Sequence, residues 1–129
     1  MQSDSYRLSA MRATPFPNRL LDLTATLPET QARIVCLIVR MTLGWNAGSP
    51  GNRRASVVLT LRQLQRRAKR SSSTPVIEAV AALAREGVVL VSWATGGDVY
   101  YSQLAAERGR PMRIGIAPEW VEEAGGSGG

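Results

Sequence analysis

The sequence predicts one domain of the α+β class, made of short helices and a few antiparallel strands. The chain has 129 residues, which is enough for one hydrophobic core and too few for two domains. An apolar stripe at helical spacing runs through residues 28–43, and residues 88–93 and 113–116 have the composition of strands. The longest wholly apolar run, Ile34 to Val39, is far shorter than the ~20 residues of a membrane span. We therefore expect no membrane partner.

The chain is expected to divide into three parts. These are a mobile N-terminal arm (residues 1–13), a folded domain (14–121) and a flexible Gly/Ser tail (122–129). At the start of the domain, Asn18 is expected to cap a short helix over residues 19–23. The N-terminal residues lack the basic and then apolar pattern of a secretion signal, and the chain has a single cysteine, so we expect a cytoplasmic protein.

Residues 28–43 are expected to form the central helix of the core. Proline suits the first turn of a helix, Glu29 complements its N-terminus, and Gly44 is placed to stop it. The apolar stripe follows the i, i+3, i+4, i+7 pattern and is widened by two valines: Ile34, Leu37, Ile38, Met41, Val35 and Val39. Cys36 lies within this segment and is interpreted as a small core residue. A stripe this wide predicts a helix that other elements contact on several sides.

A second helix is predicted after a short strand. Residues 56–59 have the β-branched character of a strand. Thr60 and Gln63, three residues apart, match a capping box that opens a helix over residues 61–68. This helix would carry its arginines on the side that faces away from the core.

A third helix is expected to follow a tight turn at residues 69–71. Either Ser72 or Ser73 can cap this helix, and Gly87 is placed to end it. Its buried stripe is expected to consist of Val76, Val80 and Leu83. Two short helices joined by a tight turn are the layout of a helix-turn-helix.

The last part of the domain is expected to contain two antiparallel strands, residues 88–93 and 113–116. Between them, Asp98 can cap a helix over residues 99–108, and a strand over residues 99–104 is the alternative; the helix is favoured. In either case, strands that follow a helix-turn-helix form a wing. The expected fold is therefore a winged helix-turn-helix with a central apolar helix and a C-terminal β-hairpin wing.

The residue types argue against an enzyme. The chain has no histidine, which removes the commonest general base and the commonest metal ligand. A single cysteine excludes disulfides and thiolate metal clusters, and the ten acidic residues form no spacing typical of a nuclease or hydrolase. We expect no catalytic residues, no metal and no cofactor.

The charge of the chain points to a polyanionic partner. Its 16 basic and 10 acidic residues give a net charge of +6. Seven cations lie between positions 47 and 77 without an acidic residue among them, on the predicted helix-turn-helix and the loop before it. We expect all seven to contact the phosphates of double-stranded DNA: Arg53, Arg54, Arg62, Arg66, Arg67, Lys69 and Arg70. A solvated helix face is the alternative.

The third helix is expected to enter the major groove as a recognition helix. The residues that would face the DNA are Ser72, Ser73, Thr74, Ile77 and Glu78. In this interpretation Ile77 touches a thymine methyl group and Glu78 accepts from cytosine N4. The alternative is that Ile77, Ala81 and Ala82 pack on another protein or on the wing. Four further arginines in the arm and the wing are candidates for the minor groove: Arg7, Arg12, Arg108 and Arg110.

Three segments resemble a known family: Phe16–Leu21, Leu27–Val35 and Leu37–Asn46, whose Arg-x-Thr-x-Gly-Trp-Asn ending is the most specific. Over residues 14–121 the chain looks like the N-terminal winged-helix domain of the phage replication protein O family, the origin-binding replication organisers. The resemblance implies a winged helix that binds repeated origin sequences. In full-length relatives a further C-terminal region recruits the replicative helicase.

We therefore expect double-stranded DNA binding, as the origin-binding module of a phage or plasmid replication initiator. A winged-helix transcriptional regulator, which would bind DNA through the same positive charge, is one alternative. Another is a protein-interaction or dimerisation module in helicase loading. The expected partners are double-stranded DNA, a replicative helicase or loader reached through a C-terminal region, and a second copy in a homodimer.

Overall fold

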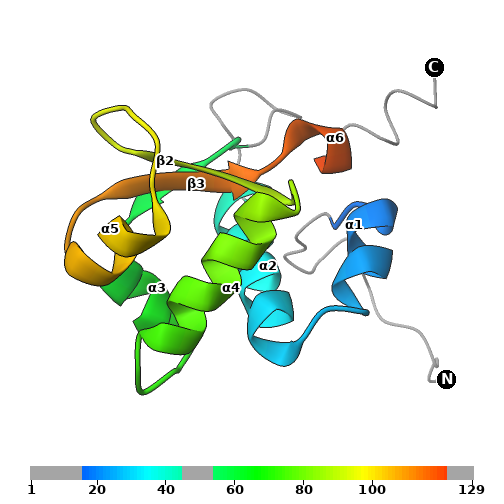
Figure 1. Ribbon diagram of the computed structural model, residues 1–129. Coiled ribbons are helices and arrows are strands. Elements are labelled where there is room, and N and C mark those ends of the chain that lie inside the picture. The colour runs from blue at the N-terminus through cyan, green and yellow to red at the C-terminus, as the bar shows by residue number, and fades with distance from the viewer. Residues whose placement is uncertain (1–15, 45–53, 122–129) are drawn as a thin grey trace, which may run out of the picture.

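The computed structural model describes residues 16–44 and 54–121. Within these ranges it has the α+β class that the sequence predicts (Figure 1). The helices and strands, in chain order, are α1 (Asn18–Thr24), α2 (Glu29–Thr42), β1 (Val57–Leu59), α3 (Leu61–Arg67), α4 (Thr74–Arg85), β2 (Val89–Trp93), α5 (Tyr101–Ala106), β3 (Met112–Ile116) and α6 (Pro118–Val121). Among them, no helix is long and apolar enough to cross a membrane.

The three strands form one antiparallel sheet in the order β1-β3-β2, so β3 is central. Met112, Ile114 and Ile116 alternate along β3 toward the helices and are buried. The opposite face of the sheet is open to solvent at Val58 and Leu90, which are 44% and 57% exposed, whereas the Ala55 backbone covers Gly115. Helices α2 and α4 cover the buried face (Figure 1).

The central helix is confirmed. Helix α2 contacts α1, α4, β1 and β3, and its residues Ile34, Val35, Ile38 and Val39 are at most 1% exposed. The interpretation of Cys36 as a core residue is wrong, because its side chain is exposed. At 100° per residue Cys36 lies 100° beyond Val35, outside the arc of α2 that holds the buried residues.

The predicted capping box is present at the start of α3. The Gln63 backbone N–H donates to Thr60 Oγ1 at 3.1 Å, and the Thr60 N–H donates to Gln63 Oε1 at 2.8 Å. At the end of α4, Gly87 has a φ of 75°, the left-handed conformation that a helix-ending glycine adopts readily. Both ends of this helix pair therefore follow from local sequence chemistry.

Three predicted caps are wrong. Asn18 is the first residue of α1, and Pro17 occupies the cap position without a side-chain bond. Ser73 precedes α4 with helical φ and ψ and also makes no side-chain cap bond. Asp98 forms an isolated bridge to Ser92 rather than capping a helix. Asn18 and Asp98 thus do not occupy cap positions, and Ser73 occupies one without making the cap hydrogen bond.

The segment between the last two strands is helical, as favoured, but over a shorter range than residues 99–108. Helix α5 spans Tyr101–Ala106, so the chain from β2 to β3 is not a simple hairpin loop. The predicted arm (residues 1–13) and tail (122–129) lie outside the described residues.

Replacing Ile38 with Asp is expected to unfold the domain. The side chain is fully buried, and an unpaired carboxylate in a core costs several kcal/mol against a total stability of about 5 to 15 kcal/mol. Cys36→Asp on the same helix is the matched control, since that position is exposed. Thermal unfolding followed by circular dichroism should show a cooperative transition for the control and none for Ile38→Asp. A folded Ile38→Asp variant would contradict the observed packing of α2.

Candidate nucleic-acid interface

Arginines from three parts of the chain surround two adjoining hollows between α2, β1 and α3. One hollow, of about 390 Å³, is lined by Leu37, Arg40, Met41, Arg54, Val57 and Arg67. The other, of about 290 Å³, is lined by Met41, Val57, Val58, Leu59, Gln63, Arg66 and Arg67. We name the four arginines of these hollows, Arg40, Arg54, Arg66 and Arg67, the basic surface.

None of the described residues that line the basic surface is acidic. Arg40, Arg66 and Arg67 are exposed, and among the described residues none of the three forms an ion pair. Guanidinium groups held close together repel one another, and a phosphate between them converts that repulsion into attraction. Their planar forks also match the oxygens of a phosphate group. The basic surface can therefore hold a polyanion.

The structure brings three of the predicted phosphate-binding residues into this surface and adds one. Arg54, Arg66 and Arg67 were expected, whereas sequence reasoning missed Arg40. Its signal was present, because a 100° step places Arg40 well away from the buried stripe of α2. The sequence did not predict that α3 and the segment before β1 lie beside that side of α2.

Arg62 and Arg108, predicted for different parts of a DNA interface, are neighbours. The backbone N–H of Arg62 at the start of α3 donates to the Arg108 carbonyl at 3.2 Å. Both side chains are exposed. Lys69 is also exposed and has a φ of 56°, which places it in the left-handed region within the turn between α3 and α4.

Arg70 is bound within the protein rather than presented to solvent. Its Nη2 lies 3.1 Å from Oε1 of Glu29, and its side chain is 24% exposed. Arg33 shares the same carboxylate at 3.6 Å and donates to the Ala68 carbonyl at 2.9 Å. Arg70 therefore ties the α3–α4 turn to α2, which differs from the predicted free phosphate contact. Arg70 Nε is buried and has no partner among the described residues.

The exposed face of α4 holds fewer candidate reading residues than predicted. Ser72, Thr74 and Glu78 are exposed, but Ser73 is 8% and Ile77 only 4% exposed. The expectation that Ile77 touches a thymine methyl is wrong, because Ile77 belongs to the core. Helix α4 packs on α2, α3, α5 and β2, so it is covered over a wider arc than one stripe. None of its residues lines the hollows of the basic surface.

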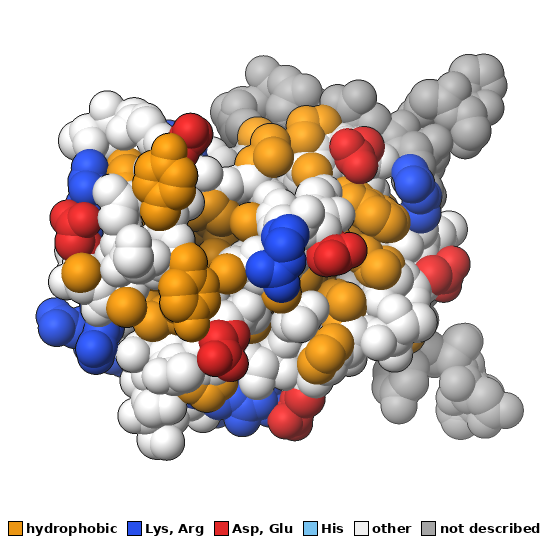
Figure 2. Space-filling model, in the orientation of Figure 1, with side chains coloured by type: hydrophobic (Ala, Val, Ile, Leu, Met, Phe, Trp, Pro, Cys, Tyr) orange, Lys and Arg blue, Asp and Glu red, His pale blue; other side chains and the backbone are white. Residues whose placement is uncertain are grey.

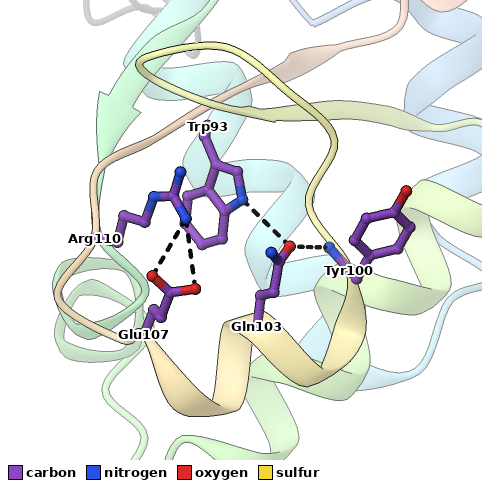
Figure 3. Close-up of polar contacts among 5 residues, drawn as sticks. All are labelled: Trp93, Tyr100, Gln103, Glu107 and Arg110. Carbon is purple, nitrogen blue, oxygen red and sulfur yellow. Dashed lines mark hydrogen bonds and ion pairs between the residues drawn. The ribbon is translucent and has the colours of Figure 1, made fainter.

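The chain between β2 and β3 is held by a polar cluster (Figure 3). Gln103 Oε1 accepts from Trp93 Nε1 at 3.3 Å and from the Tyr100 backbone N–H at 2.9 Å. The Arg110 guanidinium lies 4.1 Å from the Trp93 ring centre and pairs with Glu107 at 3.2 Å. Arg110, predicted for the minor groove, is thus bound to its own protein. Its contacts stabilise the approach to β3.

Arg7, Arg12 and Arg53 lie outside the described residues, so their predicted contacts stay predictions. Within residues 16–44 and 54–121, no group of three or more metal-ligating side chains comes together. Comparisons with protein-family models, with curated proteins and with solved structures find no match for this chain.

Replacing Gln103 with Met is expected to destabilise the domain. The change removes the acceptor of the Trp93 and Tyr100 hydrogen bonds and leaves the Nε1–H of the buried Trp93 without a partner, and an unsatisfied buried donor costs about 1–3 kcal/mol. Ser102→Ala, at an exposed position of the same helix, should change stability by less than about 0.5 kcal/mol. Urea unfolding of the two variants measures the difference. Equal stability would mean that the cluster contributes nothing.

Proposed function

We propose that this protein binds double-stranded DNA through the basic surface. The observation that carries the proposal is the convergence of Arg40, Arg54, Arg66 and Arg67 on adjoining hollows, where no carboxylate of residues 16–44 or 54–121 contributes to the lining. Bringing these positive groups together does not by itself stabilise the folded domain. When DNA binds, each phosphate that they neutralise releases counterions, which favours the complex. The net charge of +6 supports the same partner.

We also propose that the domain is a winged helix-turn-helix. The order α2, β1, α3, α4, β2, β3 supports it, with a turn joining α3 to α4 and an antiparallel pair following them. Helix α5 would then be an insertion in the wing. In this proposal α3 and the basic surface fix the domain on the backbone, and Ser72, Thr74 and Glu78 of the α4 region face the bases.

Within duplex binding, we propose the role of an origin-binding module in a phage or plasmid replication initiator. The support is the resemblance of the sequence to the replication protein O family. A transcriptional regulator would bind by the same chemistry, and genomic footprinting separates the two. Clustered repeats at one locus are expected of an origin binder, and sites scattered before genes would favour the regulator. Recruitment of a helicase or loader and formation of a homodimer remain predictions.

A protein-interaction module is a second candidate, favoured by the open face of the sheet. A hollow of about 410 Å³ there is lined mostly by apolar groups, with Leu90 57% exposed beside it. Exposed apolar area of this kind is typical of contact surfaces. This candidate predicts no steep dependence of DNA affinity on salt, so the next experiment separates it from duplex binding.

Arg66→Ala and Arg67→Ala are each expected to weaken duplex binding by about 1.5 kcal/mol, roughly tenfold, because each removes a charge-assisted hydrogen bond to a phosphate. The weakening should be similar for all sequences. The slope of log K against log salt should fall by about 0.9 for each phosphate that the variant no longer neutralises. Fluorescence anisotropy of a labelled duplex at several salt concentrations measures both quantities.

Arg113→Ala is the matched control, since Arg113 is an exposed arginine on the open face of the sheet, outside the basic surface. It should leave the salt slope of the duplex unchanged. A wild-type affinity for the duplex that hardly varies with salt would contradict the proposal and favour the interaction module.

Thr74→Ala and Glu78→Ala are expected to act differently from the arginine variants. If these exposed side chains face base edges, their loss should change the preferred base by about 1–3 kcal/mol and leave non-specific affinity nearly intact. Selection from randomised duplexes measures this preference. The same selected site for wild type and both variants would show that α4 does not read the sequence.

A further inference from the structure

A further hollow, which unlike the basic surface is lined mostly by apolar side chains, lies between α4 and α5. It measures about 350 Å³, and aliphatic side chains such as Val80, Ala84 and Leu104 line it together with Tyr100 and Tyr101. These two tyrosines are 62% and 53% exposed. Figure 2 shows hydrophobic side chains gathered over α4 and α5 on this face of the molecule. Two neighbouring aromatic residues are thus left open to solvent beside an apolar floor.

The backbone of the first of these tyrosines, Tyr100, is anchored by a hydrogen bond although its ring is exposed. The backbone N–H of Tyr100 is bound by Gln103 Oε1, which also accepts from the buried Trp93. The Tyr100 ring points away from this polar cluster (Figure 3). An aromatic ring presented on a fixed backbone loses little conformational entropy when it binds a partner.

The charge of the residues that line the hollow indicates the chemical class of its ligand. Within the part of the chain that the structure describes, Arg85 is the only charged residue that lines this hollow, so the site favours a ligand that is aromatic or apolar and also anionic. A nucleotide has both properties, with a base for the tyrosine rings and the floor and a phosphate for Arg85. By contrast, none of the described residues that line the basic surface is aromatic.

We propose that the hollow between α4 and α5 binds an unpaired base of single-stranded DNA. The base stacks on the Tyr100 and Tyr101 rings, and Arg85 contacts the adjoining phosphate. A base within a duplex is stacked on both faces, so only an unpaired base is available to these rings. The inference rests on the proposed function in one respect, that the ligand is DNA. It adds a separate site for a different form of DNA.

The test uses the full chain and a labelled single strand of oligothymidylate, with the labelled duplex measured in parallel. Tyr100→Ala and Tyr101→Ala should each weaken single-strand binding by about 5-fold to 150-fold, the range for loss of one base–aromatic stack. Tyr→Phe at either position should preserve affinity, because the ring remains. Leu21→Ala, at an exposed apolar position of α1, is the matched control and should have no effect.

Two further arms identify the chemistry. An abasic strand of the same length and charge should bind the wild type much more weakly than oligothymidylate. Arg85→Ala should reduce the salt slope for the single strand by about 0.7, whereas Arg113→Ala should not.

Unchanged single-strand affinity in the tyrosine-to-alanine variants, or equal binding of the abasic strand, would overturn the inference. If those variants instead alter the mass in analytical ultracentrifugation, the hollow is a protein contact and the inference also fails. Failure of duplex binding would show itself separately, as loss of the effect of Arg66→Ala. Because both tyrosine side chains are exposed, their substitution should leave the circular dichroism spectrum unchanged.

Discussion

Helix α2 is buried along two adjacent rows of side chains, and the rest of the domain is arranged around it. One row contains Ile34, Ile38 and Thr42, and the other Val35 and Val39. Thr42 remains compatible with burial because its hydroxyl donates to the Ile38 carbonyl at 2.6 Å. With α4 and the sheet packed on these rows, α2 has one narrow open side. The orientation of that side determines where Arg40 reaches solvent.

The basic surface is a consequence of this arrangement. Arg40 emerges from the open side of α2, where α3 brings Arg66 and Arg67 and the chain before β1 brings Arg54. Other cations are bound within the fold. Glu29 holds Arg70 and Arg33, while Glu107 and Trp93 hold Arg110. None of the four arginines of the basic surface lines the α4–α5 hollow.

The two proposed DNA sites differ in the physical interaction that each supplies. The basic surface offers several guanidinium groups and suits the regular phosphates of a duplex. The α4–α5 hollow offers two aromatic rings and one cation, which suits stacking of a separated base. An initiator acts where a duplex opens, so sites for both forms of DNA on one small domain are chemically consistent with the proposed role.

Local sequence chemistry by itself determined most of the helices and strands and some of their ends, but it did not predict α6. The i, i+4 spacing defined α2, the Thr60–Gln63 pair defined the start of α3, and Gly87 defined the end of α4. Periodicity along a single helix carries this information because it depends only on neighbours three and four residues away. It also separated apolar from polar sides correctly for most of α2.

Only the tertiary structure decided which cations are available and which residues of α4 are buried. Arg70 and Arg110 appear as charges in the sequence, but their partners Glu29 and Trp93 lie on other elements. Ile77 is buried because α4 has neighbours on several sides. Such contacts depend on how helices pack against one another, and the residue pattern within a single segment does not predict that packing.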